Sequence, residues 1–236
     1  ETGHALYELG VADSLHGTIL AEGTSLGIHE SQSRMWENMI GRSREFWTYW
    51  LPQLKRTFPD QLQNVSLEAF YRGINRVKPS LIRVEADEVT YGLHVILRFE
   101  LEQALIAGDL TVDDLPGAWN EKSRHLLGVE PPDYAHGVLQ DVHWSFGAFG
   151  YFPTYALGNL YAAQFLTVME RDMPTMWSAV AEGQTGEILT WLRRRIHRYG
   201  KVRSAGTLMQ EITGQPLDPS YFIDYLNRKY GEIYRI

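Results

Sequence analysis

Glycine and proline divide this sequence into segments in which apolar residues recur every three to four positions. That spacing places side chains on one face of an α-helix, whereas half-buried strands need strict alternation, which is scarce here. With 44% hydrophobic residues in 236, the chain is long enough to bury a sizeable core and is predicted to fold as all-α. We predict helices over 1–22, 31–40, 66–76, 84–106, 157–173, 187–199, 205–213 and 219–230, with another helix start at Thr111.

Charge and composition limit the classes of partner. The formal net charge of −7 argues against nucleic acid or an anionic membrane as the main partner. The absence of cysteine excludes disulfides, thiolate metal sites and cysteine nucleophiles, and it is compatible with a reducing compartment. No uncharged apolar run approaches the roughly 20 residues that a membrane helix needs. We therefore expect a cytoplasmic protein.

The opening stretch carries a partial metal-binding pattern. Glu1 and His4 lie three residues apart, and Glu30 follows after a break that contains Gly23 and Gly27. A histidine directly before Glu1 would complete H-E-x-x-H, the helical zinc-peptidase motif. On a helix these side chains share a face, where two histidines and a third ligand hold zinc and the glutamate accepts a proton from water. Because E-x-x-H alone is a common string, it is weak evidence by itself.

The chain also begins in an unusual way for a complete protein. Its first residue is Glu1 rather than Met, and a helical apolar pattern is already running there without an N-cap. We expect the chain to be the C-terminal part of a longer polypeptide.

A second polar cluster, Ile82-Arg83-Val84-Glu85-Ala86-Asp87, precedes a long apolar segment. The guanidinium of Arg83 can bind a carboxylate with two parallel hydrogen bonds, and that carboxylate belongs either to a substrate or to a neighbour. Glu85, Asp87 and Glu88 are the candidates for an internal ion pair.

A third cluster is Gly137-Val138-Leu139-Gln140-Asp141-Val142-His143-Trp144, followed by a stretch that is poor in charge and rich in glycine and aromatic residues. Asp141 and His143 are candidates for a carboxylate that orients a ligand and a donor to a developing oxyanion. A core histidine with satisfied hydrogen bonds is the simpler alternative. Tyr151, Tyr155 and Tyr161 are further candidate donors, although core packing explains them equally.

Taken together, the sequences HESQ at 29–32, IRVEAD at 82–87 and GVLQDVHW at 137–144 resemble three signature motifs of the carboxypeptidase Taq family of metallocarboxypeptidases. ETGHALYE at 1–8 resembles the metal-binding helix of the same family without its first histidine. The resemblance extends over essentially the whole chain, including the tail PLDPSYFIDYLNRKYGEIY.

The resemblance implies an all-helical, two-lobed molecule of roughly twice this length, similar to neurolysin, with a deep central groove. It implies a metal-dependent exopeptidase, usually a homodimer, that removes C-terminal residues from peptides with broad preference and uses zinc or, alternatively, cobalt. In this chain it implies a metal helix over 1–23, a third-ligand helix over 30–40 and a cleft-lining segment over 137–158.

The same resemblance assigns roles to individual residues. Glu1 is expected to be the general base, and His4 and Glu30 are expected to be metal ligands. Arg83 is expected to contact the free carboxylate of the substrate together with Gln140, and His143 is expected to act catalytically in the cleft.

Two upstream family motifs, His-Pro-Phe and Asp-x-Arg-x-Thr, are absent, as is the first metal histidine. We therefore expect the chain to need the missing N-terminal portion for tight metal binding and activity. A catalytically silent helical interaction or dimerisation module is the main alternative, and an endopeptidase of the related clan is another.

Overall fold

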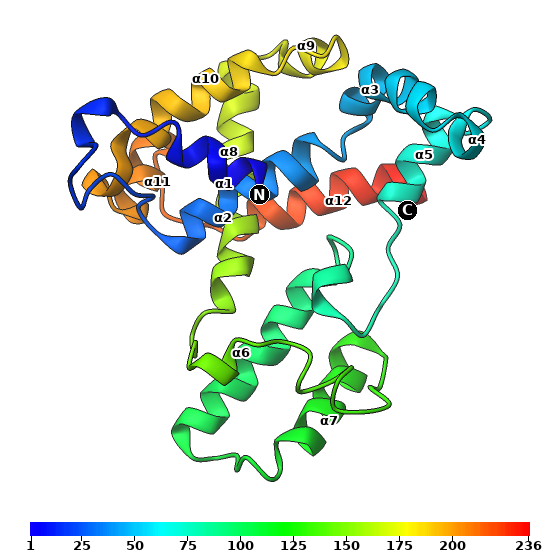
Figure 1. Ribbon diagram of the computed structural model, residues 1–236, viewed down its shortest axis with the longest axis vertical. Coiled ribbons are helices and arrows are strands. Elements are labelled where there is room, and N and C mark those ends of the chain that lie inside the picture. The colour runs from blue at the N-terminus through cyan, green and yellow to red at the C-terminus, as the bar shows by residue number, and fades with distance from the viewer. The chain divides into compact units, whose positions relative to one another are not determined.

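The structure, a computed structural model, describes residues 1–236 and contains helices and no strand, which confirms the all-α prediction (Figure 1). The chain divides into two compact units, one formed by Glu1–Ile74 with Leu157–Ile236 and the other by Asn75–Ala156. We call them the first and the second unit.

The first unit combines both ends of the sequence. Its helices are α1 (Thr2–Glu8), η1 (Asp13–Leu15), α2 (Leu26–Arg34), the π-helix η2 (Met35–Ile40), α3 (Arg44–Thr57), α4 (Pro59–Leu62), α5 (Leu67–Ile74), most of α8 (Pro153–Asp172), α9 (Met176–Ala181), α10 (Gly186–Arg195), η5 (His197–Val202), α11 (Ala205–Thr213) and α12 (Ser220–Tyr234).

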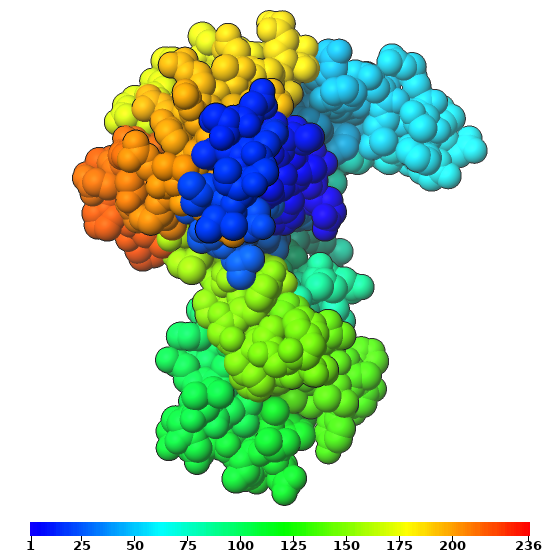
Figure 2. Space-filling view, turned by 60° about the vertical axis from the view of Figure 1, so that its left-hand side comes forward, coloured from blue at the N-terminus to red at the C-terminus, as the bar shows by residue number.

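One apolar core holds this unit together. Side chains from the N-terminal segment, such as Tyr7 and Ile28, are fully buried in the same cluster as Phe165 and Leu192 from the C-terminal half. In the space-filling view the blue N-terminal segment lies against the gold and orange segments (Figure 2), where the Lys201 N–H donates to the Leu20 carbonyl at 2.9 Å. Burial of apolar area from distant segments therefore fixes the N-terminal region in place.

The second unit contains η3 (Arg83–Glu85), α6 (Tyr91–Ala107), α7 (Leu115–Leu127), η4 (Trp144–Phe146) and the first turn of α8. Leu97 and Leu101 of α6 pack with Trp119 of α7 in one buried cluster.

Serine caps define several helix starts. Ser25, Ser43 and Ser204 each accept a hydrogen bond from the backbone N–H three residues later, which satisfies a donor that the first turn leaves unpaired. The prediction for 205–213 is confirmed residue for residue by α11.

The prediction of a first helix over 1–22, and with it a metal helix over 1–23, is wrong. Helix α1 ends at Glu8, and Leu9, which the apolar pattern placed on the buried face, is 74% exposed. Gly10 lies so close to His197 that a Cβ atom there would stand 2.6 Å from the imidazole. Tertiary packing therefore ends the helix before the local pattern does.

Two other predicted helices need correction. The helix predicted over 31–40 begins earlier, at Leu26, and turns into a π-helix at Met35. The helix predicted from Val84 begins only at Tyr91. The Asp87 carboxylate accepts hydrogen bonds from the N–H groups of residues 89 and 90, which form a turn directly before the helix.

The segment over 137–158, which the resemblance implies to line a cleft, is exposed in part. Leu139, Val142 and Phe146 are each about two-thirds exposed, whereas Phe152 is buried. No helix in the chain combines the length and apolar content that crossing a bilayer requires.

Candidate metal centre

His4 and Glu30 are brought together by the contact of α1 with α2 in the first unit. Gly3 makes this contact close, because a Cβ atom at that position would stand 2.3 Å from the carbonyl oxygen of Gln32. His4 follows Gly3 directly, and its Nε2 atom lies 3.3 Å from Oε2 of Glu30. The two predicted ligands are therefore neighbours in space although they are 26 positions apart in the sequence.

Glu30 is held from two sides. Its Oε1 atom accepts a hydrogen bond of 2.7 Å from Nε of Arg34, one turn later on α2, so that Oε2 is the oxygen turned to His4. Gly158 of α8 packs beneath it, since a Cβ atom there would lie 2.4 Å from Cγ of Glu30. Burial raises the pKa of Glu30, but the contact with His4, the hydrogen bond from Arg34 and the charge of Arg34 outweigh burial and hold it below its usual range.

His4 is linked through its other ring nitrogen to a pair of side chains. Its Nδ1 atom lies 2.6 Å from Nδ1 of His29, and Nε2 of His29 lies 2.7 Å from Oε1 of Glu8. The ring centroids of His4 and His29 are 4.7 Å apart. A metal-binding histidine usually has such a partner on the nitrogen that does not face the ion.

The separation of His4 and Glu30 fits a shared metal ion. Nitrogen and oxygen ligands lie about 2.0–2.2 Å from zinc, so two ligands of a tetrahedral centre are about 3.4 Å apart. The observed 3.3 Å between Nε2 and Oε2 matches that spacing. The chain contains no group of three or more His, Cys, Asp or Glu side chains arranged to hold a metal. It thus supplies two donors of a set that needs at least one more.

Glu1 stands at the N-cap position of α1, where its side chain is exposed. It lies one helical turn before His4, on the same side of the helix. The predicted base and the first predicted ligand therefore share a face.

The second unit gathers Arg83 and Gln140 around one carboxylate. Asp141 Oδ1 accepts from Nε and Nη2 of Arg83 at 3.1 and 2.7 Å, and Asp141 Oδ2 accepts from Nε of Arg98 at 2.6 Å. Arg83 has 5% of its surface exposed and Arg98 none. The expected internal partners of Arg83, among them Glu85, are wrong, because the carboxylate that binds it comes from a segment 58 residues later.

This ion cluster is strongly coupled. Burial lowers the pKa of Arg98 to about 10, although the charge of Asp141 opposes that effect. Burial raises the pKa of Asp141, but the hydrogen bond from Arg83 and the charges of Arg98 and Arg83 outweigh it, and the pKa lies below its usual range. All three groups therefore stay charged at neutral pH.

Gln140 uses its amide within the same unit. Its Oε1 atom accepts from the Arg83 N–H at 2.9 Å and from Nη2 of Arg98 at 2.8 Å, and Nε2 donates to the carbonyls of Leu81 and His136, each at 3.0 Å. A substrate contact of Gln140 stays a prediction, since the geometry gives this side chain a role in positioning Arg83 and Arg98.

His143 lies in an aromatic cluster, with its ring centroid 4.4 Å from that of Phe152 and 5.3 Å from that of Tyr151. Its Nε2 atom lies 3.0 Å from the hydroxyl of Tyr155, and its Nδ1 atom is buried without a hydrogen-bond partner. Burial, together with the charges of Arg83 and Arg98, lowers the pKa of His143, so the imidazole is neutral at pH 7.

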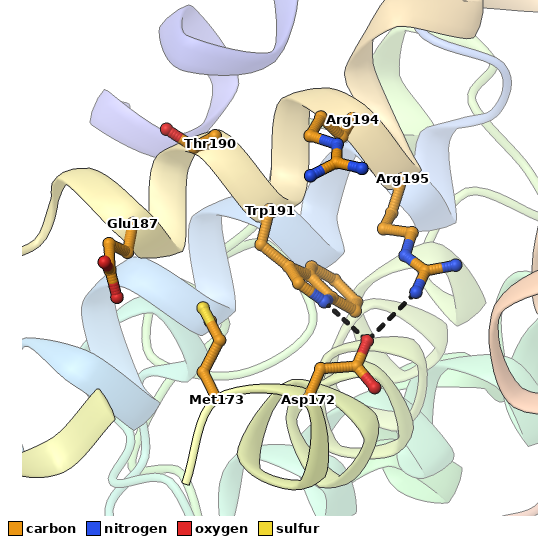
Figure 3. Close-up of a pocket in the computed structure, with 7 residues that line it drawn as sticks. All are labelled: Asp172, Met173, Glu187, Thr190, Trp191, Arg194 and Arg195. Carbon is orange, nitrogen blue, oxygen red and sulfur yellow. Dashed lines mark hydrogen bonds and ion pairs between the residues drawn. The ribbon is translucent and has the colours of Figure 1, made fainter. Parts of the chain in front are cut away.

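A cavity of about 490 Å³ between α8 and α10 contains none of the predicted site residues (Figure 3). Its Asp172 carboxylate accepts hydrogen bonds from Nε1 of Trp191 at 2.9 Å and Nη2 of Arg195 at 3.1 Å. These polar groups bind one another, which gives the cavity a structural explanation.

Sequence reasoning missed Glu8, His29, Arg34 and Gly158 as parts of the site. Glu8 follows His4 by four residues and Arg34 follows Glu30 by four, which is the spacing of neighbours on one helical face. That signal was available, whereas nothing local marks Gly158 as the residue beneath Glu30.

Comparisons with known proteins show which family the chain resembles. The family model described as "Carboxypeptidase Taq (M32) metallopeptidase" matches residues 1–230. "Thermostable carboxypeptidase 1" of Thermus thermophilus is 50% identical over 99% of this chain and 46% of its own length, and "Carboxypeptidase 1" of Bacillus subtilis is 46% identical over 99% and 47%. The chain spans about half the length of these relatives.

Solved structures give the same result. The M32 carboxypeptidase from Deinococcus radiodurans superposes with a TM-score of 0.98 at 46% identity, covering 100% of this chain and 48% of that one. The Pyrococcus furiosus carboxypeptidase gives 0.95 at 43%, covering 98% and 46%. With the match over nearly its whole length, the His4–Glu30 pair and the helical fold, this chain belongs to the carboxypeptidase Taq (M32) metallopeptidase family.

Proposed function

We propose that this chain forms part of a metal-dependent carboxypeptidase that removes C-terminal residues from peptides with broad preference. The observation that carries the proposal is the 3.3 Å approach of Nε2 of His4 to Oε2 of Glu30, which suits two ligands of one divalent cation. Zinc fits the nitrogen and carboxylate donor set best, and cobalt is the alternative.

A bound divalent cation supplies Lewis-acid chemistry, since it lowers the pKa of water toward neutrality and polarises a carbonyl. Arg34 keeps Oε1 of Glu30 occupied, so that Glu30 offers Oε2 alone. Glu1, one turn from His4, has a free carboxylate suited to accept a proton from water as general base.

Arg83 is proposed to bind the free carboxylate of the substrate, with Gln140 as a further substrate contact. Asp141 occupies the Nε and Nη2 side of the Arg83 guanidinium, and Tyr91 accepts from Nη1 at 2.9 Å. Five N–H donors are available on a guanidinium, so Arg83 retains donors for a second carboxylate. We propose that His143, neutral at pH 7, donates a hydrogen bond to the developing oxyanion.

We propose further that the activity needs an N-terminal portion of the same protein, which would supply the remaining ligand, and that the protein is a cytoplasmic homodimer. The share of about half of each relative that the chain covers supports the first of these proposals.

An activity assay tests the proposal on the protein that contains both portions. An N-blocked peptide and its C-terminally amidated twin are incubated with the zinc-loaded protein. We expect cleavage of the free acid only, because the amide lacks the charge that Arg83 binds. Equal cleavage of both peptides would contradict the exopeptidase assignment.

Metal ligation is tested separately by Glu30→Gln, with Glu211→Gln as its matched control. Glu211 is exposed and pairs with Arg203 on the surface. We expect zinc affinity to fall strongly in Glu30→Gln and to stay unchanged in the control.

A catalytically silent interaction module is the second candidate, because this chain by itself supplies only two donors. Zinc titration of the protein that contains both portions distinguishes the candidates. Tight stoichiometric binding that depends on His4 and Glu30 would argue against the silent module.

A further inference from the structure

We propose that His29 and Glu8 are positioning residues that hold His4 in the tautomer and ring orientation required for metal binding. The proposal rests on the proposed metal site at His4 and Glu30. It concerns two side chains that act through the imidazole of His4.

The hydrogen-bond chain has one direction. A carboxylate at neutral pH only accepts, so the 2.7 Å contact with Oε1 of Glu8 requires a proton on Nε2 of His29. An imidazole that carries one proton, on Nε2, presents a lone pair at Nδ1. Because Nδ1 of His4 lies 2.6 Å from that lone pair, the proton between the two rings belongs to His4.

The consequence falls on the opposite side of the His4 ring. A neutral imidazole with its proton on Nδ1 has its lone pair on Nε2, which is the atom 3.3 Å from Oε2 of Glu30. A lone pair facing a carboxylate oxygen is repulsive unless a cation lies between them. His29 and Glu8 thus select the form of His4 that is ready to bind a cation.

The residues around His29 restrict its side chain. The ring centroid of buried Tyr7 lies 5.1 Å from that of His29. Gly23 leaves room for the imidazole, since a Cβ atom at position 23 would stand 2.7 Å from Cδ2 of His29. The Gly23 N–H also donates to Oε1 of Glu8 at 3.3 Å. His29 therefore has little freedom to turn away from His4.

The two positioning residues differ in exposure. The side chain of His29 is 23% exposed and that of Glu8 is 45% exposed. Solvent screens the more exposed contact, so the effect of Glu8 should be the smaller one. Loss of a partner behind a metal ligand typically lowers metal affinity by about 10–100-fold.

Nitrogen-15 long-range correlation spectra of the protein before metal addition give the first test. We expect the His29 ring to carry its proton on Nε2 and the His4 ring to carry one on Nδ1. A His29 ring protonated on Nδ1 and bare at Nε2 would overturn the proposal, whatever the activity of the protein.

Zinc affinity, measured by competition with a chelator, gives the second test. His29→Leu removes the acceptor for His4 and should weaken binding about 10–100-fold. His29→Asn retains an oxygen acceptor near the place of Nδ1 and should restore most of the affinity. Glu8→Leu should weaken binding a few-fold, whereas Glu8→Gln keeps an acceptor and should bind nearly as tightly as the parent.

The control is His16→Leu, because His16 is exposed and lies outside this hydrogen-bond chain. Equal affinity of His29→Leu and His16→Leu would overturn the proposal, and so would an equal loss in His29→Leu and His29→Asn. If Glu30→Gln also leaves zinc affinity unchanged, the proposed metal site itself fails. If only Glu30→Gln weakens binding, the metal site stands and the role of His29 fails.

Discussion

Gly158→Ala should disturb the candidate metal centre through a single added methyl group. In α8 a Cβ atom at position 158 would stand 2.4 Å from Cγ and 2.7 Å from Cβ of Glu30. Carbon atoms in contact normally lie about 3.5–4.0 Å apart, so the pair is more than about 1 Å too close. Glu30 is buried and bound to Arg34, which leaves it little room to yield.

The expected cost follows from two opposing effects. Alanine is better than glycine in a helix interior by about 1 kcal/mol. Forcing an extra methyl group into a packed site costs about 1–3 kcal/mol. We expect Gly158→Ala to lower the free energy of unfolding by up to about 2 kcal/mol, and to weaken zinc binding because relief of the clash moves the Glu30 carboxylate away from His4.

Urea denaturation and a zinc titration measure the two effects. Gly206→Ala is the matched control, because Gly206 lies in α11 of the same unit and a Cβ atom there meets nothing within 4 Å. The control should be unchanged or more stable by up to about 1 kcal/mol. If Gly158→Ala is as stable as Gly206→Ala and binds zinc equally well, the reasoning from close packing beneath Glu30 is wrong.

Three further predictions concern buried ionisable side chains. Asp141→Asn removes the carboxylate that pairs with the fully buried guanidinium of Arg98. It should lower the free energy of unfolding, measured by urea denaturation, by about 3–5 kcal/mol. Burial, aided by the charge of Arg98, lowers the pKa of His94 to about 4. Between pH 6.5 and 4 only the unfolded state then gains a proton at this residue, so the free energy of unfolding falls with acidification by up to about 3 kcal/mol. His94→Phe should flatten that pH dependence. Lys229→Met removes a donor to the Asn38 carbonyl in the π-helix and should lower the free energy of unfolding by about 1–3 kcal/mol in urea denaturation. An unchanged free energy of unfolding would contradict this prediction.

Local patterns predicted several helix boundaries closely and missed others. The helix predicted from residue 66 is one example of close agreement. Ser66 caps α5, because its hydroxyl accepts a hydrogen bond from the Ala69 N–H at 3.1 Å. The end of α1 at Glu8 could not be predicted, because it depends on the close approach of Gly10 to His197, almost 190 residues away along the chain. Sequence spacing carries no information on such contacts.

The candidate site shows the same division. His4 and Glu30 were predicted from residue type and order, and their approach to 3.3 Å supports that prediction without testing the metal itself. The link from His4 through His29 to Glu8 was not predicted, although all three residues lie in the opening segment that carries the partial metal-binding pattern. Which nitrogen faces which partner is decided by how α1 and α2 cross.

Residue chemistry and helical periodicity, both local properties, determined the all-α class, the family resemblance and the identity of the candidate ligands. Tertiary structure alone decided where α1 stops, that Asp141 rather than Glu85 binds Arg83, and that a glycine of α8 lies beneath Glu30. The physical reason is that burial and close packing join residues far apart in the sequence, and they override local propensities that differ by only about 1 kcal/mol.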